Sequence, residues 1–221
     1  MECRLHYTPD QLQNLPLVLS QPRFTTYLDA ANGDPKRALD LYVWNSDVTA
    51  AFSFPLQLAE VGLRNGIATA IEKVYGPDWP DSRPFLRDLG HRRRGYNPAS
   101  DLSTTFRKVD TTGKVIAELK FAFWQEMFTA RHDNTIWNPH LASCFPNCPF
   151  ANVQQMRGHA YREVNEVRKL RNRIAHHEPI FARNLAQDLA RVKAIALWLN
   201  HVGEAWVNEK ETVTALLGIR P

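Results

Sequence analysis

The sequence predicts an all-α fold, and three observations lead to this class. Apolar residues recur at intervals of three and four along several long segments, as they do on one face of a helix. Helix-start pairs such as Asp34-Pro35 precede such segments, and Gly76-Pro77 ends one of them. No segment shows a clear strand pattern, and the chain contains no internal repeat. We therefore expect residues 1–221 to form one helical bundle.

The first third of the chain is expected to be helical over most of its length. A short helix begins at Thr8-Pro9, and residues 20–33 are predicted to be a loop with a short helical piece near Phe24 to Ala31. A long helical pattern runs over residues 34–75, and Pro55 must kink or break it because proline lacks an amide donor. The apolar face of its second half carries Leu63, Ile67, Ile71 and Val74.

The middle of the chain has weaker patterns. Residues 76–113 contain prolines, glycines and a basic cluster, so we expect an irregular insertion with little regular structure. Residues 113–131 are predicted to be one helix with an apolar face. Residues 132–150 are rich in aromatic residues and proline, and this composition predicts an irregular segment.

Two long helices are predicted in the last third. The first covers residues 151–175 and is stopped by Pro179; the second covers residues 183–206. A last helical turn near residues 209–217 follows. Trp124, Trp137 and Trp198 are expected to be core or interface aromatics.

Composition restricts the function classes only mildly. Apolar residues make up 44% and charged residues 23% of the 221 residues, as in an ordinary globular protein. The formal net charge of +4 mildly favours a polyanionic partner. Three cysteines give no disulfide framework, and we see neither a signal segment nor an apolar run of membrane-span length. We therefore expect a cytoplasmic protein without a membrane partner.

The most informative stretch runs from Leu170 to Pro179. It places Arg171 and His176 five residues apart, with the amide of Asn172 between them. A guanidinium binds phosphate oxygens in a two-pronged geometry, and an imidazole exchanges protons near neutral pH. Both are needed to cut a phosphodiester, and such chemistry requires neither a metal nor another cofactor. Further cations flank this pair and are candidate RNA contacts: Arg168, Lys169 and Arg173.

This stretch resembles the signature of the HEPN superfamily, an arginine and a histidine separated by four to six residues. Within the superfamily, the chain looks most like the Abi-like (abortive infection) family. The resemblance covers roughly residues 8–205, because other segments occur in the family's order: Trp44-Asn45, Leu58 to Asn65, Tyr75 to Trp79, Phe121 to Trp124, Trp137, and Phe145-Pro146.

The resemblance implies a HEPN-like bundle and a metal-independent endoribonuclease that defends against phage. The 2′-hydroxyl of RNA would attack the adjacent phosphorus, with His176 as general base or acid and Arg171 stabilising the phosphorane oxygens. HEPN domains pair two-fold, so a homodimer would supply two copies of each residue. The resemblance also allows for a regulator, either an antitoxin or a phage-derived product.

Supporting roles are open to two interpretations. Asn172 and His177 are candidates for contacts to substrate or to the imidazole, and Arg64 and Asn65 lie in a second family segment. Glu60 and Arg64 also have the spacing of an ordinary helix ion pair. A separate basic cluster contains Arg92, Arg93 and Arg94 beside Tyr96; it is either an RNA-binding loop or a solvated basic loop.

Two alternatives to the enzyme remain. The first is a catalytically inactive HEPN module that binds RNA or a protein. The arginine and histidine would then have a structural role, because cations near a helix C-terminus interact favourably with the negative end of the helix dipole. A zinc-stabilised interaction protein is the weaker alternative. Cys144 and Cys148 are spaced by four, with His132 and His140 nearby, but a full set of four ligands is missing, so we expect no metal site.

Overall fold

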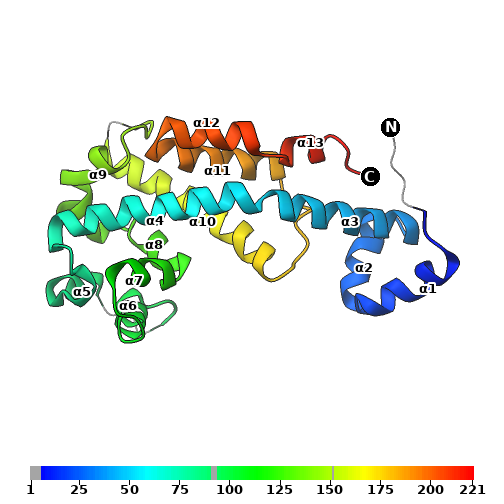
Figure 1. Cartoon of the computed structure of the whole chain (residues 1–221), viewed down its shortest axis with the longest axis horizontal. Helices are drawn as coiled ribbons and strands as arrows, with labels where there is room; N and C mark the ends of the chain where they lie inside the picture. The colour runs from blue at the N-terminus through cyan, green and yellow to red at the C-terminus, as the bar shows by residue number, and fades with distance from the viewer. Residues whose placement is uncertain (1–5, 91–93, 151) are drawn as a thin grey trace.

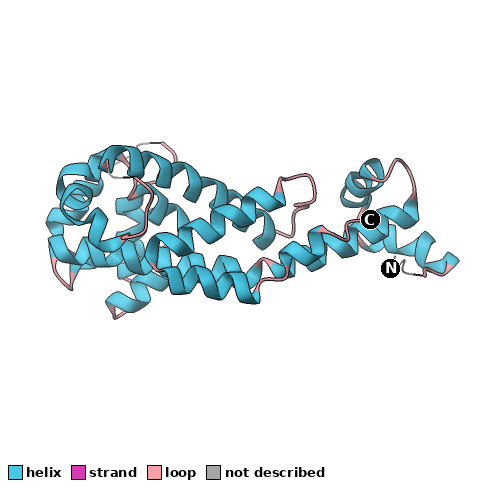
Figure 2. Cartoon of the chain, turned by 90° about the horizontal axis from the view of Figure 1, so that it is seen from above, coloured by secondary structure: helices cyan, strands magenta, loops and turns pink. Residues whose placement is uncertain are grey.

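The computed structural model describes residues 6–90, 94–150 and 152–221. The described part is all-α and contains no strand, which confirms the predicted class (Figures 1 and 2). None of its helices is both long enough and apolar enough to cross a membrane. The helices are α1 (Pro9–Val18), α2 (Gln21–Ala30), α3 (Pro35–Ala51), α4 (Ser53–Tyr75), α5 (Arg83–Leu89), α6 (Pro98–Phe106), α7 (Thr112–Glu118), α8 (Phe121–Glu126), α9 (Asn138–Cys144), α10 (Val153–Ala175), α11 (Leu185–Leu199), α12 (His201–Lys210) and α13 (Val213–Leu217).

Helices α3 and α4 follow one another along the length of the molecule (Figure 1). Asp34 caps α3 as expected, since its carboxylate accepts from the backbone N–H groups of Lys36 and Arg37 at 2.9 and 3.1 Å. The two helices are separated at Phe52, and Pro55 lies in the first turn of α4, where no intrahelical donor is needed. The predicted break is therefore confirmed.

Helix α4 is the centre of the packing. Helices α10 and α11 are antiparallel neighbours joined by a loop; α11 and α12 pack along α4, and α10 packs on α11 and α8. Leu199 of α11 lies against Gly62 and Gly66 of α4, where a side chain would leave no room: a Cβ atom on Gly66 would be 2.8 Å from Leu199 and 3.2 Å from the ring of Phe145. Small residues thus let α4 and α11 approach closely.

The molecule is elongated, and the N-terminal helices α1 and α2 lie at one of its ends (Figure 1). The predicted helix start at Thr8-Pro9 is confirmed, and Thr8 forms a capping box with Gln11. The short helical piece expected near Phe24 to Ala31 is confirmed by α2, but α2 already begins at Gln21, so less of residues 20–33 is loop than predicted. Phe24 and Tyr27 are buried there, and burial of these rings stabilises a helix that its sequence alone supports weakly.

Residues 76–113 were expected to have little regular structure, and this prediction is wrong. This segment contains α5, α6 and a 3₁₀ turn at Trp79–Asp81, at the opposite end of the molecule from α1. Ser82 and Asn97 cap the two helices, each with a proline in the following first turn. Their apolar side chains are fully or almost fully buried and fix the segment: Trp79, Phe85, Leu89 and Leu102.

The single helix expected over residues 113–131 is divided into α7 and α8. Leu119 and Lys120 between them are extended, with ψ values of 135° and 146°. A continuous helix would place Trp124 opposite Val115 and Phe121 about 120° away from it, since successive residues turn by about 100°. The break lets all of these apolar side chains be buried.

Two further regions differ from the prediction: residues 132–150 contain more regular structure, and the predicted 183–206 helix is two helices. A five-residue π turn (Asp133–Trp137) leads into α9. Helix α10 matches the predicted 151–175 helix, whereas the predicted 183–206 helix is interrupted by extended Asn200, whose side chain caps α12. The three tryptophans predicted for the core are buried: Trp124, Trp137 and Trp198.

The close approach of α4 and α11 gives a test of the packing. We expect Gly66→Ala to lower the free energy of unfolding by up to about 2 kcal/mol, because steric crowding costs about 1–3 kcal/mol and the gain in helix propensity returns about 1 kcal/mol. Gly113→Ala in α7 is the control: nothing lies within 4 Å of the added Cβ, so it should be neutral or stabilise by about 0.4–1 kcal/mol. Urea unfolding measures both, and equal stability of the two variants would contradict the close packing.

Candidate functional site

The histidines of the motif lie at the end of α10. The helix ends at Ala175, as the position of Pro179 predicted, and His176 is its C-terminal cap residue. His177 follows with φ = 53°, in the left-handed region that ends many helices. Both imidazoles are exposed, and no hydrogen bond or ion pair holds either of them among the described residues. They are free to meet a ligand or a partner.

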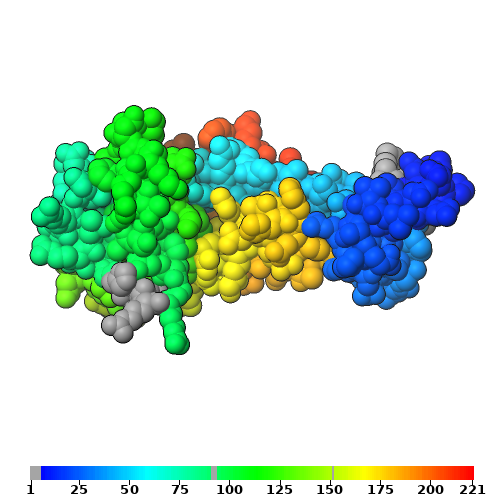
Figure 3. Space-filling view, turned by 90° about the horizontal axis from the view of Figure 1, so that it is seen from below, coloured from blue at the N-terminus to red at the C-terminus, as the bar shows by residue number. Residues whose placement is uncertain are grey.

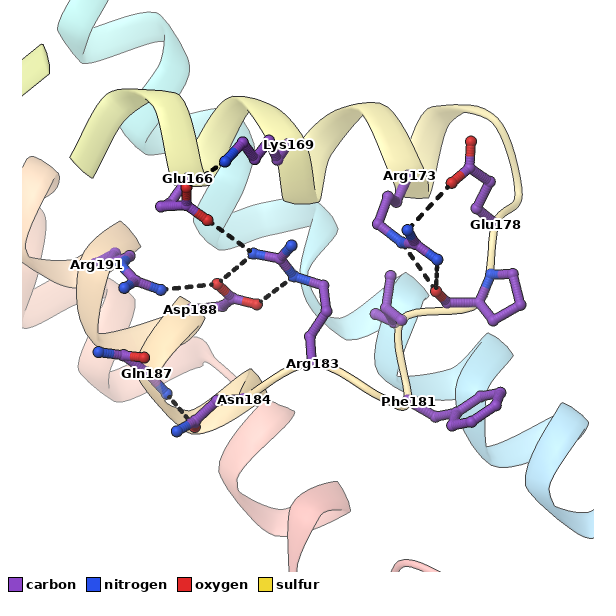
Figure 4. A network of polar contacts seen from close by, with 12 residues as sticks. Glu166, Lys169, Arg173, Glu178, Phe181, Arg183, Asn184, Gln187, Asp188 and Arg191 are labelled. Atoms are coloured by element: carbon purple, nitrogen blue, oxygen red, sulfur yellow. Dashed lines mark hydrogen bonds and ion pairs between the residues drawn. The ribbon is translucent and has the colours of Figure 1, made fainter. Parts of the chain in front are cut away.

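A strap of backbone, residues 176–184, connects α10 to α11 and presents these histidines. Arg173 holds its first part: Nε and Nη2 donate to the carbonyl oxygen of Pro179 at 3.0 and 2.7 Å, and Nη1 lies 3.4 Å from Glu178 (Figure 4). The backbone N–H of Glu178 also donates to the carbonyl oxygen of Arg173 at 2.8 Å. The guanidinium of Arg173 thus closes the turn.

Helices α2 and α3 hold the strap from the other side. Arg23 donates to the carbonyl oxygen of His177 at 2.6 Å, and the ring of Tyr27 lies 5.1 Å from that of Phe181. The buried side-chain oxygen of Asn45 accepts two backbone N–H groups, from Ile180 at 2.8 Å and from Phe181 at 3.1 Å. The position of the histidine turn is therefore set by residues far away in the sequence.

A network of charges fixes the end of the strap (Figure 4). Arg183 makes a two-pronged contact of 2.7 and 2.8 Å with Asp188, whose carboxylate is buried and also accepts from Arg191 at 3.2 Å. The hydrogen bonds to Asp188 raise the pKa of Arg183. The hydrogen bond from Lys169 holds the pKa of Glu166 below its usual value, with Arg183 and Arg191 acting in the same direction.

A cavity of about 410 Å³ lies where α4, α10 and the α7–α8 junction meet. Leu119 and Lys120 of the extended α7–α8 junction form part of its wall, so the helix break that the sequence did not reveal contributes to the cavity. Space-filling atoms of α10 and of the strap form part of the surface between α1–α2 and α5–α8 (Figure 3). The lining residues are Arg64, Ala117, Glu118, Leu119, Lys120, Phe121, Ala122, Arg168, Arg171 and Asn172.

Glu60 organises the cations around this cavity. Its carboxylate forms an ion pair with Arg64 and lies 3.5 Å from Nε of Arg171. Arg64 also donates to the carbonyl oxygen of Ala117 at 2.8 Å, which ties α4 to the end of α7. The ordinary ion pair predicted between Glu60 and Arg64 is thus present, and Arg64 is beside Arg171 as well.

The cavity brings together some of the predicted site residues and not others. Arg64, Arg168, Arg171 and Asn172 line it, whereas Asn65 is exposed on α4. Neither His176 nor His177 is among its lining residues, so one chain does not place the motif arginine and histidine in a single pocket.

The remaining predicted RNA contacts lie elsewhere. Lys169 is engaged with Glu166 at 2.6 Å, and Arg173 closes the strap. Arg94 is exposed, while Arg92 and Arg93 lie outside the described residues. The roles of these five residues in RNA binding stay predictions.

Two features of the site were missed in the sequence. The link from Glu60 to Arg171 joins residues that are far apart in the chain, and only the i,i+4 spacing to Arg64 drew attention to Glu60. The α7–α8 junction contains no proline or glycine that would have marked it. In the described part of the chain, no group of three or more His, Cys, Asp or Glu residues is arranged to hold a metal ion.

Comparisons with protein-family models, with curated proteins and with solved structures give no match to this chain. The family resemblance therefore rests on the residues quoted from the sequence.

The anchoring of the strap can be tested at Asn45. We expect Asn45→Ala to lower the free energy of unfolding by about 2–6 kcal/mol, because two buried N–H groups lose their acceptor at about 1–3 kcal/mol each. Amide hydrogen exchange should accelerate at Ile180 and Phe181 in particular. Asn138→Ala, at an exposed residue of α9, is the control and should change stability by less than about 0.5 kcal/mol. Unchanged exchange at both amides would contradict the anchoring.

Proposed function

We propose that this chain is a metal-independent endoribonuclease of the HEPN type, that it acts in the cytoplasm and that it serves in abortive-infection defence against phage. The observation that carries the proposal is the arrangement at the end of α10. Arg171 is held by Glu60 at a cavity lined by further cations, and His176 ends the same helix with its imidazole exposed. These are the two residues that the sequence motif names.

The chemistry requires RNA. The 2′-hydroxyl attacks the neighbouring phosphorus, the 5′-oxygen of the next nucleotide leaves with a proton, and a 2′,3′-cyclic phosphate remains. His176 moves a proton in this reaction, and Arg171 stabilises the charge that develops on the non-bridging oxygens. The contact with Glu60 orients the guanidinium of Arg171 without enclosing it, since its side chain keeps 42% of its accessible surface.

A homodimer supplies what one chain lacks. Base and acid are both needed, and His176 alone does not serve both steps at once. Because His176 lies outside the arginine-lined cavity of its own chain, a two-fold pairing of the exposed helix ends would bring two imidazoles and two guanidiniums to one cleft. An antitoxin or a phage-derived product would regulate such an enzyme by covering or releasing this cleft.

The alternative is a catalytically inactive HEPN module that binds RNA or a protein. The same separation of His176 from the cavity favours it, because binding to cations does not need the imidazole. Cleavage and binding are therefore measured separately in the two experiments below.

The first experiment measures catalysis. Purified protein is incubated with total RNA in chelator, and we expect Arg171→Ala and His176→Ala each to reduce cleavage by about 100-fold or more. Helical content and melting temperature should stay nearly unchanged, because Glu60 keeps its pair with Arg64 when Arg171 is removed. Arg162→Ala, at an exposed arginine of the same helix, should cleave like the parent. Full activity in either motif variant would remove the proposed roles.

The second experiment measures assembly. We expect the active species to sediment as a homodimer, and dilution below the dimer dissociation constant should lower the specific activity together with the dimer fraction. Analytical ultracentrifugation and cleavage assays over the same concentration series compare the two quantities. Specific activity that persists in the monomer would show that a single chain is sufficient.

A further inference from the structure

We propose that the cavity between α4, α10 and the α7–α8 junction binds one nucleotide unit through its phosphate. This inference rests on the proposed function, in that the nucleotide would belong to the RNA strand being cut. It goes further by assigning the class of ligand, the residues that bind its phosphate and the residue that limits the space for its sugar. Arg168 and Arg171 are the phosphate-binding residues, Arg64 is their support, and Ala122 sets the space for the sugar.

The charges at the cavity favour an anion. Among the residues that the structure describes, four of those lining it are cationic (Arg64, Lys120, Arg168 and Arg171) and one, Glu118, is acidic. Glu60, which is shared by two guanidiniums, and Asp101, which lies 3.5 Å from Nζ of Lys120, offset part of the positive charge. An excess of positive charge therefore remains in a partly enclosed space, where a bound anion gains more than it would at an open surface.

Arg168 keeps a donor available to a ligand at the cavity. Among the described residues it donates from Nη2 to the side-chain oxygen of Asn165 at 3.2 Å, which leaves Nη1 for an anion. Its Nε atom, like that of Arg64, is buried from solvent and makes no hydrogen bond. The terminal nitrogens are therefore the donors that an acceptor oxygen in the cavity would meet.

A phosphate fits these donors better than a carboxylate does. A carboxylate has only two oxygens, and Asp188 elsewhere in this chain uses both of them for Arg183 and Arg191. A phosphate offers more oxygens and can be shared by Arg168 and Arg171, which lie three residues apart on α10 and both line the cavity.

The volume indicates more than a phosphate ion. At about 410 Å³, the cavity falls in the range of roughly 300–1,000 Å³ that is typical of small-molecule sites. Besides the cations, the lining includes Leu119 of the junction, Phe121 and Ala122. This composition suits a sugar and the edge of a base, and Asn172 supplies an amide to the same space. A phosphodiester within RNA and a free mononucleotide share this chemistry.

The test measures binding by calorimetry, using the full chain. The probes are adenosine 5′-monophosphate, inorganic phosphate, adenosine, and a single-stranded oligodeoxynucleotide that cannot be cleaved because it lacks 2′-hydroxyls. We expect the monophosphate to bind and adenosine to bind at least tenfold more weakly. Tighter binding of the oligonucleotide would identify a strand as the source of the phosphate; tighter binding of the monophosphate would identify a free nucleotide.

Three variants separate the cavity from general charge. Arg168→Gln should weaken binding of the monophosphate about tenfold or more, as expected for a lost charge-assisted contact. Ala122→Leu keeps every cation and fills the space, so it should weaken the monophosphate while leaving inorganic phosphate nearly unaffected. Arg162→Gln removes an exposed cation from the same helix and should change neither affinity by more than about twofold.

The outcomes keep this inference distinct from the proposed enzyme activity. His176→Ala should bind the monophosphate like the parent, so binding without any RNA cleavage would reject the ribonuclease and retain the nucleotide site. RNA cleavage by the parent chain, together with unaltered monophosphate affinity in both Arg168→Gln and Ala122→Leu, would retain the ribonuclease and reject the nucleotide site. Failure of the parent chain to bind the monophosphate, or equal loss of affinity in Arg162→Gln, would overturn the inference.

Discussion

The carboxylate of Glu60 joins the two helices on which the candidate site depends. It lies on α4, the helix at the centre of the packing, and it reaches both Arg64 of its own helix and Arg171 of α10. Arg64 in turn holds the carbonyl oxygen at the end of α7. One acidic side chain thus connects three elements. Its side chain is 14% exposed, so the two guanidiniums supply the compensation that a mostly buried carboxylate requires.

Local signals were sufficient for the long helices. Asp34 with Pro35, Gly76, and the apolar spacing on α10 each act within one or two helical turns, and each gave the boundary that the structure has. The same kind of signal was present but unused in the region of α5 and α6, where Ser82 and Asn97 precede prolines. There the density of glycine and proline suggested a loop, although the buried aromatic rings stabilise short helices.

The break between α7 and α8 could not be read from neighbouring residues. Leu119 and Lys120 are ordinary helix formers, and they become extended because Phe121 and Trp124 find their burial among α4, α6 and α10. The cavity depends on that break, so its shape was beyond sequence reasoning even though most of its cations had been singled out. The separation of His176 from the cavity was likewise decided by the course of the strap after Ala175.

The strap has a consequence for the order in which the chain assembles. Its anchors pair Arg23 with His177 and Asn45 with Ile180, contacts that span 154 and 135 residues. Contacts of such long sequence separation form late, because the entropy of closing the loop must first be overcome. During synthesis, α2 and α3 exist well before residue 177 has been made. The histidine turn therefore takes its final geometry only after α2 and α3 have packed against the strap, and a nascent chain that ends before the strap lacks it.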